Sequence, residues 1–397
     1  MHLSRQIGIL LSVLVAGIIV STLLMLGIYA IPTSLVEKHV HVSAELIGQE
    51  GLVAYVIPGY NQSRLDNFTD ALMLGEAVFT PYKTLAENAM LNERFSGYDP
   101  VSSLLESLDG AAPETEPYAR YWHGYLLFLK PLLLFFSIGS IRYLLAITEI
   151  LLMLLFTVEL AKHGKQAVMA FFALLAGLCP PALMNSLHYA PCFMIAIIAG
   201  FLVLHSNRSY PVIFLLTGMS TAFIDFLTFP ILTLIIPLTV YVLQSRKTHP
   251  WILLFPVFAW SLGYAGLWAG KWLVGSILLR RNLFSDALLT LLTRTSAQDV
   301  QGYAVPVTAG FTACLRTLIT PVTMIACLVS IISLLPSVKT SDHKKRFPLL
   351  LTAMMPVLWT LLACNHSLEH AFFAYRTLAA SIFPLVLAVS PPKEKAL

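Results

Sequence analysis

Charged residues are scarce in this sequence. Asp, Glu, Lys and Arg make up 12% of the 397 residues, whereas hydrophobic residues make up 57%. A soluble globular chain carries roughly 25% charged residues. With a mean hydropathy of +0.77, the composition excludes an ordinary soluble protein and indicates that lipid surrounds much of the chain.

Cysteine is absent from the long polar segment 32–140. The five cysteines, Cys179, Cys192, Cys314, Cys327 and Cys364, lie in or beside apolar segments. Disulfide bonds therefore do not hold the polar segment. A basic patch is also missing, because the net charge is only +4 and the basic residues are dispersed. We therefore expect no nucleic-acid partner.

Long apolar runs divide the chain. Residues 7–31 contain no charge over 25 residues, which exceeds the roughly 20 residues needed to cross a bilayer core. This run is too long for a signal-peptide core, so we expect a retained first helix. Similar runs predict ten spans, at 7–31, 141–161, 166–183, 189–205, 211–227, 229–245, 250–275, 313–335, 348–363 and 372–390. The predicted fold is an all-α polytopic membrane protein, with 1–397 as a single transmembrane domain.

The distribution of Lys and Arg predicts the orientation. If the N-terminus is cytoplasmic, the inside connections at 162–165, 207–208, 246–247 and 339–346 all carry basic residues. The short opposite connections, near 184–188, 223–229 and 364–371, contain no Lys or Arg. This asymmetry follows the positive-inside rule. We expect an integral protein of a bacterial plasma membrane with both termini in the cytoplasm.

Two longer segments then lie outside the cytoplasm. The first extracytoplasmic loop, 32–140, holds 13 of the 21 acidic residues and is the candidate water-facing region. Its aromatic end, 118–131, and the second segment, 276–312, are typical of helices that lie in the membrane interface. The sequence thus predicts a large, helical first extracytoplasmic loop.

Asp66 and Asp70 are the strongest catalytic candidates. They stand four residues apart at a predicted helix start, so their side chains share a face. One carboxylate can act as a general base toward a hydroxyl, and the pair can bind a divalent cation, the only cofactor that the sequence suggests. Alternatively, Asp66 caps the helix and Asp70 stabilises its first turn. We favour Asp70 as the base because Asp66 is the better cap candidate.

Other ionisable residues collect on the same outer side, where such groups at membrane depth tend to mark a site. The candidates for substrate binding are His123, His188, Asp225, Arg280, Arg281, His366, His370 and Arg376. Arginine suits a phosphate because its guanidinium offers two parallel donors. The alternatives are a helix cap for Asp225, a structural role for His123, and arginines that snorkel to the interface.

This layout resembles the GT-C superfamily of integral-membrane glycosyltransferases. Those enzymes have a large first extracytoplasmic loop with an acidic residue, and they take sugar from a polyprenyl-phosphate carrier. The resemblance is architectural and covers most of the chain. It is carried by Asp66 and Asp70, by residues 121–125, by the turn around Asp225, and by residues 365–376.

The resemblance implies an inverting glycosyltransferase that acts on the extracytoplasmic side. The donor would be a polyprenyl-phosphate sugar within the membrane lipid, and the acceptor a glycan, lipid or protein. Asp66 or Asp70 would deprotonate the acceptor. Arg280, Arg281, His370 or Arg376 would hold the donor phosphate.

Two other functions remain open. A transporter or flippase for a lipid-linked or anionic substrate would use the same arginines and histidines, but it would place them near the bilayer midplane. An acyltransferase or polymerase of envelope glycans would use His366 or His370 as its base. An assay with a labelled donor distinguishes these functions, because an enzyme forms a new bond to the label and a transporter moves the donor unchanged.

Overall fold

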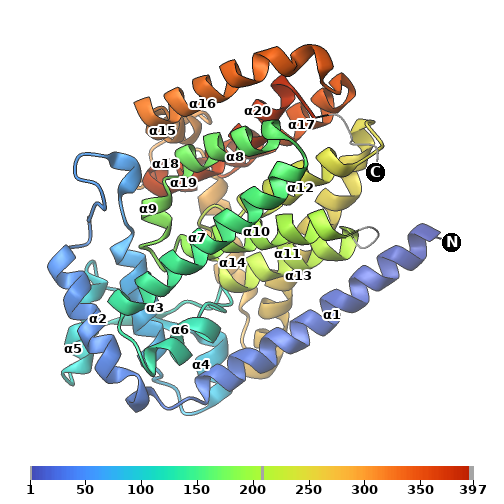
Figure 1. The fold of residues 1–397 in the computed structure, drawn as a ribbon. Helices are drawn as coiled ribbons and strands as arrows, with labels where there is room; N and C mark the ends of the chain where they lie inside the picture. Colours follow the sequence, from blue (N-terminus) through green and yellow to red (C-terminus); the bar gives the residue numbers. More distant parts are fainter. Residues whose placement is uncertain (1, 207–209, 393–397) are drawn as a thin grey trace.

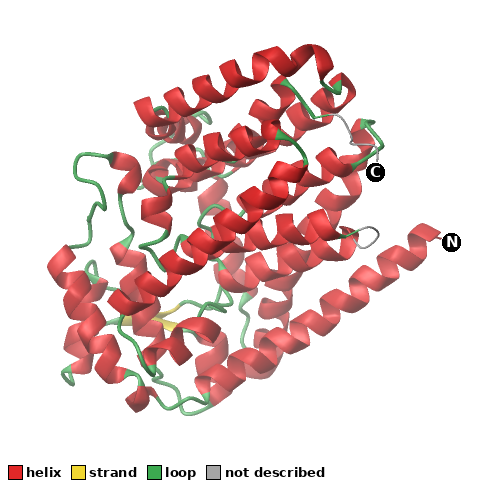
Figure 2. Ribbon diagram, in the orientation of Figure 1, coloured by secondary structure: helices red, strands yellow, loops and turns green. Residues whose placement is uncertain are grey.

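The protein is mainly helical and contains almost no sheet. The computed structural model describes residues 2–206 and 210–392, and 74% of the structure is helix. Among the described residues, the only sheet is an antiparallel pair of strands, β1 (Glu93–Phe95) and β2 (Thr115–Pro117). Figure 2 shows this small sheet surrounded by helices. The prediction of an all-α fold is confirmed.

Five helical stretches among the described residues are long and apolar enough to cross a membrane. The first two are single helices, and each of the other three joins two consecutive elements. They are α1 (His2–Tyr29), α7 (Ile138–Lys162), η3 with α13 (Pro250–Leu253 and Leu254–Leu279), α16 with η4 (Pro321–Leu334 and Leu335–Thr340), and α19 with α20 (Ala371–Ala379 and Ile382–Val389). These stretches agree with an integral membrane protein.

The remaining bundle helices are shorter. They are α8 (Lys165–Leu178), α9 (Pro180–Leu183), α10 (Ala190–His205), α11 (Tyr210–Ile224), α12 (Leu232–Gln244), α15 (Ala309–Leu318), α17 (Arg346–Leu362) and α18 (Cys364–Glu369). Helices thus lie in each of the ten segments predicted as spans. At 1.5 Å per residue, the 14 residues of α8 extend only about 21 Å, less than the roughly 30 Å core of a bilayer.

Close packing holds the centre of the bundle together. A Cβ atom on Gly218 of α11 would lie 2.1 Å from the carbonyl oxygen of Trp260 in α13. In return, a Cβ atom on Gly263 of α13 would lie 2.2 Å from the carbonyl oxygen of Leu215. The two backbones approach this closely only because both positions lack a side chain, as is common between membrane helices.

Segment 32–140, called the loop body below, folds as a group of short helices at one end of the bundle, far from the N-terminus in Figure 1. Its elements besides the strands are η1 (Thr33–Leu35), α2 (Glu37–Glu50), η2 (Asn61–Ser63), α3 (Asn67–Val78), α4 (Leu85–Leu91), α5 (Pro100–Leu108) and α6 (Leu126–Leu133). Val40, Ala44 and Ile47 form one fully buried face of α2. Capping residues also stabilise the helices of this segment: Thr84 and Glu87 form a capping box at the start of α4, and Asp99 caps α5.

The aromatic end of this segment differs from its expected form. Helix α6 begins only at Leu126, and residues 118–125 form buried turns instead of a helix on the surface. Trp122 is fully buried and donates a hydrogen bond of 2.8 Å to the carbonyl of Leu267 in α13. The aromatic side chains therefore dock the loop body onto the bundle. By contrast, α14 (Phe284–Thr295) exposes Leu288, Leu289 and Leu292, as an interfacial helix would.

Candidate functional site

A cavity of about 390 Å³ opens between the loop body and the end of the bundle. Its polar lining combines one carboxylate with several arginine and histidine side chains, and its apolar lining is rich in aromatic rings. The polar residues are Asp66, Thr69, Arg64, Arg94, Arg120, Arg294, His188, His366 and His370. The aromatic residues are Phe68, Tyr118, Tyr121, Phe226, Phe372 and Phe373. Segments far apart in the sequence meet here.

Asp66 reaches the cavity from the start of α3. It is the N-cap of that helix, with Oδ1 accepting from the backbone N–H of Thr69 at 3.2 Å and Oδ2 from its hydroxyl at 2.6 Å. Oδ2 also accepts from Nδ1 of His188 at 2.9 Å. Burial raises the pKa of a carboxyl group, but the hydrogen bonds from His188 and Thr69 outweigh it and hold the pKa of Asp66 below its ordinary value. Asp66 therefore carries a negative charge.

His188 is fixed from several sides, in the connection between α9 and α10. Its ring lies 4.8 Å from the ring of Phe226 and 5.1 Å from that of Phe373, measured between centroids. The bond from Nδ1 to Asp66 sets the tautomer, because a carboxylate only accepts. Within the described part of the chain, no hydrogen bond engages Nε2. The arrangement matches a carboxylate that orients an imidazole base.

Asp70 lies behind this pair, not in the cavity lining. It is fully buried, and its carboxylate accepts from the N–H of Leu187 at 3.1 Å, the N–H of His188 at 3.0 Å and the hydroxyl of Ser186 at 3.2 Å. Burial raises its pKa to about 6, although the nearby Arg142 opposes the shift. Asp70 holds the segment that carries His188, one turn along α3 from Asp66.

Arg142 supports the carboxylates from α7. Its guanidinium donates to both carboxylate oxygens of Glu50 at 2.7 and 2.9 Å and to the side-chain oxygen of Asn67 at 3.0 Å. The same group lies 3.8 Å from Asp70. One terminal nitrogen makes both contacts with Glu50 and the other terminal nitrogen binds Asn67, and such charge-assisted hydrogen bonds are stronger than neutral ones. This network therefore ties α2, α3 and the start of a candidate span into one unit.

We expect Asp70→Asn to lower stability, because an amide nitrogen cannot accept the backbone N–H groups that the carboxylate binds. Each buried donor left without an acceptor costs about 1–3 kcal/mol. Thermal unfolding in detergent measures the loss as a lower Tm. Asp286→Asn is the control, because its ion pair with Arg120 is 3.3 Å long and its side chain is 49% exposed, where such pairs contribute little. Equal unfolding temperatures for both variants would contradict a clamping role for Asp70.

Arg64 differs from the other arginines of the cavity. Arg94 pairs with Glu116, Arg120 with Asp286 and Arg294 with Glu369. Within the described residues, no carboxylate pairs with Arg64. Its guanidinium lies 3.8 Å from the centre of the Phe372 ring, and its Nε is buried without a hydrogen-bond partner. Arg64 thus brings an uncompensated positive charge, held in place by stacking, to the cavity wall.

Two histidines also line the cavity. His366 and His370 have ring centroids 4.8 Å apart, and Nε2 of His370 lies 3.0 Å from the guanidinium of Arg294. Burial lowers the pKa of His370 to about 3, with a further contribution from Arg294. Burial and the neighbouring His370 also place the pKa of His366 well below its ordinary value. Both rings are neutral near pH 7 and can donate or accept hydrogen bonds.

His123 and Asp225 lie outside the cavity lining. His123 is buried, with Nδ1 2.7 Å from a Glu76 oxygen and Nε2 3.0 Å from the carbonyl oxygen of Tyr118. Asp225 caps its own turn, accepting from the N–H groups of Leu227 at 2.9 Å and Thr228 at 3.1 Å. Leu227 has a φ of +73°, so this turn needs such support. The observed contacts of both residues are structural.

The three arginines predicted to bind phosphate also lie outside the lining. Arg280 and Arg281 are exposed just beyond the end of α13. Arg376 is fully buried in α19 and donates to the carbonyl oxygens of Leu178 at 2.9 Å and Gln62 at 3.0 Å. It therefore joins α19 to α8 and the loop body. Of the predicted binding residues, the structure brings His188, His366 and His370 together with Asp66.

The sequence alone does not predict the site or support residues Arg64, Arg94, Arg120 and Arg142. Arg64 stands two residues before Asp66, and that proximity was the one available signal. Arg94 and Arg120 carry no local pattern, because β1, β2 and the turns after them bring them to the cavity. Arg142 resembles an ordinary interfacial arginine until its contact with Glu50 is known.

The side chains around the cavity do not form a recognisable metal site among the described residues. Among the residues that the structure describes, no group of three or more His, Cys, Asp and Glu side chains is arranged to hold an ion. Asp66 and Asp70 direct their oxygens at protein donors instead.

Comparisons with protein-family models, curated proteins and solved structures find no significant match. The architectural resemblance described above therefore stays an expectation.

Proposed function

We propose that the protein is an inverting glycosyltransferase that moves a sugar from a polyprenyl-phosphate carrier to an acceptor hydroxyl. The observation that carries the proposal is the cavity itself. It combines a buried carboxylate–imidazole pair, Asp66 and His188, with four arginines in the same lining. Proton removal from the acceptor and stabilisation of a departing phosphate are the two requirements of such a transfer.

The base in this mechanism is His188, oriented by Asp66. Geometry decides between the carboxylates, because a base must reach the proton that it removes. The pKa of about 6 would suit Asp70, but Asp70 is engaged with backbone N–H groups behind the wall. The pKa of Asp66 lies below its ordinary value, which makes it a weak base and a good partner for an imidazolium ion.

The reaction is a single displacement. The acceptor oxygen attacks the anomeric carbon while its proton passes to Nε2 of His188. The bond between that carbon and the carrier phosphate breaks, and its electron pair stays with the phosphate. Attack opposite the leaving group inverts the configuration. Asp66 stabilises the imidazolium that forms, as a carboxylate does in other acid–base pairs.

Arg64 binds the phosphate in this scheme. Its guanidinium has no carboxylate partner among the described residues, and phosphate accepts two parallel N–H groups well. Arg294, which lies 3.0 Å from Nε2 of His370, adds a second guanidinium to the lining. The rings of Phe226, Phe372 and Phe373 provide apolar surface for the sugar and the first isoprene unit.

The chain crosses the membrane about ten times in this proposal. Short helices such as α8 cross with the help of non-helical segments, which membrane proteins tolerate where the backbone is buried in protein. The loop body and the cavity lie outside the cytoplasm, and both termini lie inside, in a bacterial plasma membrane. The basic connections at 162–165 and 339–346 support this orientation.

Cysteine labelling tests the orientation. Cysteines placed at Asp109 or Thr295, both exposed at the loop end, should react with a membrane-impermeant thiol reagent in intact cells. Cysteines at Lys165 or Thr340, exposed at the opposite end, should react only after the cells are opened. The parent chain, whose five cysteines are buried or half-buried, supplies the background. Reversed labelling would place the cavity in the cytoplasm.

The activity is tested directly with purified protein, bacterial membranes as acceptor, and a panel of radiolabelled polyprenyl-phosphate hexoses and pentoses. Label that moves into a product distinct from the donor, together with release of polyprenyl phosphate, is the expected result. Movement of intact donor across liposome bilayers without bond formation would favour the transporter instead. Inactivity with every donor, alongside acyl transfer to envelope glycans, would favour an acyltransferase.

A further inference from the structure

A second hollow lies at the opposite end of the bundle from the cavity. Helix α11 begins at Tyr210, which lines the hollow, and ends at Ile224, two residues before Phe226 of the cavity. The hollow has a volume of about 770 Å³. It is framed by the starts of α1, α11 and α13 and by the connection between α12 and α13. Its chemistry is separate from the proposed transfer.

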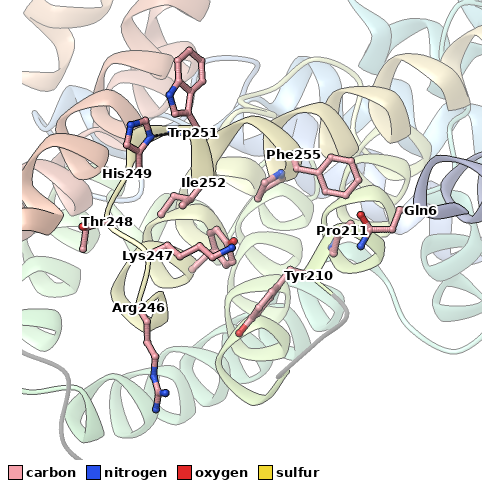
Figure 3. A pocket seen from close by; sticks show the side chains of 12 residues that line it. Gln6, Tyr210, Pro211, Arg246, Lys247, Thr248, His249, Trp251, Ile252 and Phe255 are labelled. Carbon is pink, nitrogen blue, oxygen red and sulfur yellow. Dashed lines mark hydrogen bonds between the residues drawn. The ribbon is translucent and has the colours of Figure 1, made fainter. Parts of the chain in front are cut away.

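The lining of the hollow is cationic and aromatic. Arg246, Lys247 and His249 come from one connection, and Asp and Glu are absent from the described residues that line it. Figure 3 shows Lys247 extending across the hollow, with Arg246 extending outward from the same connection. Tyr210 and Tyr241 have ring centroids 4.8 Å apart. Positive charge beside tyrosine rings favours an anion that stands at a membrane surface.

Exposed apolar side chains lie near the hollow on two of the helices that frame it, α1 and α13. Ile252, Phe255 and Pro256 form the apolar wall of the hollow. Leu254, the first residue of α13, is 58% exposed, Phe258 one turn later is 46% exposed, and Ile9 of α1 is 45% exposed. α1 and α13 are both candidate spans, so these side chains face the hydrocarbon region of a bilayer. A ligand in the hollow therefore has a cationic place for its head and an apolar surface for its tails.

We propose that this hollow binds the headgroup phosphate of an anionic membrane lipid, whose acyl chains lie along α1 and α13. A soluble phosphate would make no contact with the exposed apolar side chains of α1 and α13. A zwitterionic lipid would bring its own cation to a lining whose described residues already include Arg246, Lys247 and His249. The site lies in the leaflet opposite the catalytic cavity and does not depend on the proposed glycosyl transfer.

Native mass spectrometry of the full chain in neutral detergent tests the proposal, with phosphatidylglycerol as the probe. One basic residue near a membrane surface contributes about five-fold in affinity. Lys247→Gln should therefore weaken binding about five-fold, and Arg246→Gln combined with Lys247→Gln about thirty-fold. The control combines Lys165→Gln with Lys339→Gln, two exposed lysines at the same end that do not line the hollow. It should change affinity less than two-fold.

Two further measurements identify the ligand. Phosphatidylcholine should bind at least ten-fold more weakly than phosphatidylglycerol, and millimolar inorganic phosphate should not displace the bound lipid. A photoreactive phosphatidylglycerol should crosslink within 241–258. Equal losses in the two double variants would indicate diffuse surface charge and overturn the site. Displacement by inorganic phosphate, or equal binding of phosphatidylcholine, would overturn the assignment to an anionic lipid.

Discussion

Asp66→Asn should lower the turnover of lipid-linked sugar transfer by about 10²–10⁴-fold, the usual contribution of general acid–base catalysis. Asparagine keeps the size of the carboxylate and can still cap α3. It lacks the negative charge of the carboxylate, which accepts a hydrogen bond from Nδ1 of His188 and stabilises the protonated form of that imidazole. The amide nitrogen would instead favour the tautomer with the proton on Nε2, the atom proposed as the base.

The matched control is Asp99→Asn. Asp99 also caps a helix of the loop body, accepting from the N–H of Val101 at 2.9 Å, but it does not line the cavity. Loss of a cap costs about 0.5–2 kcal/mol of stability, so both variants should unfold at slightly lower temperatures. Only Asp66→Asn should lose turnover. His188→Gln should match it within about ten-fold, because the two residues act as one unit.

Kinetic constants separate this role from a structural one. The Asp66 and His188 variants should keep the KM for the donor and lose kcat, because the base acts only as the reaction proceeds. Near-normal turnover in both variants would leave the carboxylate–imidazole pair as scaffolding. The glycosyltransferase proposal would then lose its chemical basis, although the fold and the lipid site would be unaffected.

Local sequence patterns predict local features of this protein well. Charge scarcity predicts the helical membrane fold, and the positions of apolar runs predict where helices lie. The cap at Asp66 is also predicted, since an acid before a helix start is a local signal. The spacing of Asp66 and Asp70 does not predict that one faces the cavity while the other points behind it. That difference depends on residues 186–188, which approach from 116 or more positions away.

The predicted phosphate ligands illustrate the limit. Arg376 appears in the sequence as an arginine near a polar loop, yet its guanidinium donates to the carbonyl oxygens of Leu178 and Gln62. Arg64 appears as a loop residue and instead stacks on Phe372, more than 300 positions along the chain. Tertiary contacts decide which arginine makes structural hydrogen bonds and which stays available for a ligand. Patterns in a single sequence do not reveal those contacts.

Arg64→Gln should raise the KM for a polyprenyl-phosphate donor about ten- to a hundred-fold. Hydrogen bonds to charged groups contribute about 1.5–3 kcal/mol, which corresponds to that range. Arg64→Lys should recover only part of the loss, because an ammonium group keeps the charge but cannot offer two parallel donors. Steady-state kinetics with a labelled donor, analysed as kcat/KM, measures both variants.

The control for Arg64 is Arg281→Gln. Arg281 is exposed beyond the end of α13 and does not line the cavity, although its sequence context predicts a phosphate ligand. Its substitution should change KM less than two-fold. The opposite result, with Arg281 essential and Arg64 dispensable, would place the donor phosphate on the outer surface of the bundle. The assignment of His188 as the base would then lose its support, because Arg281 does not line the cavity that holds His188.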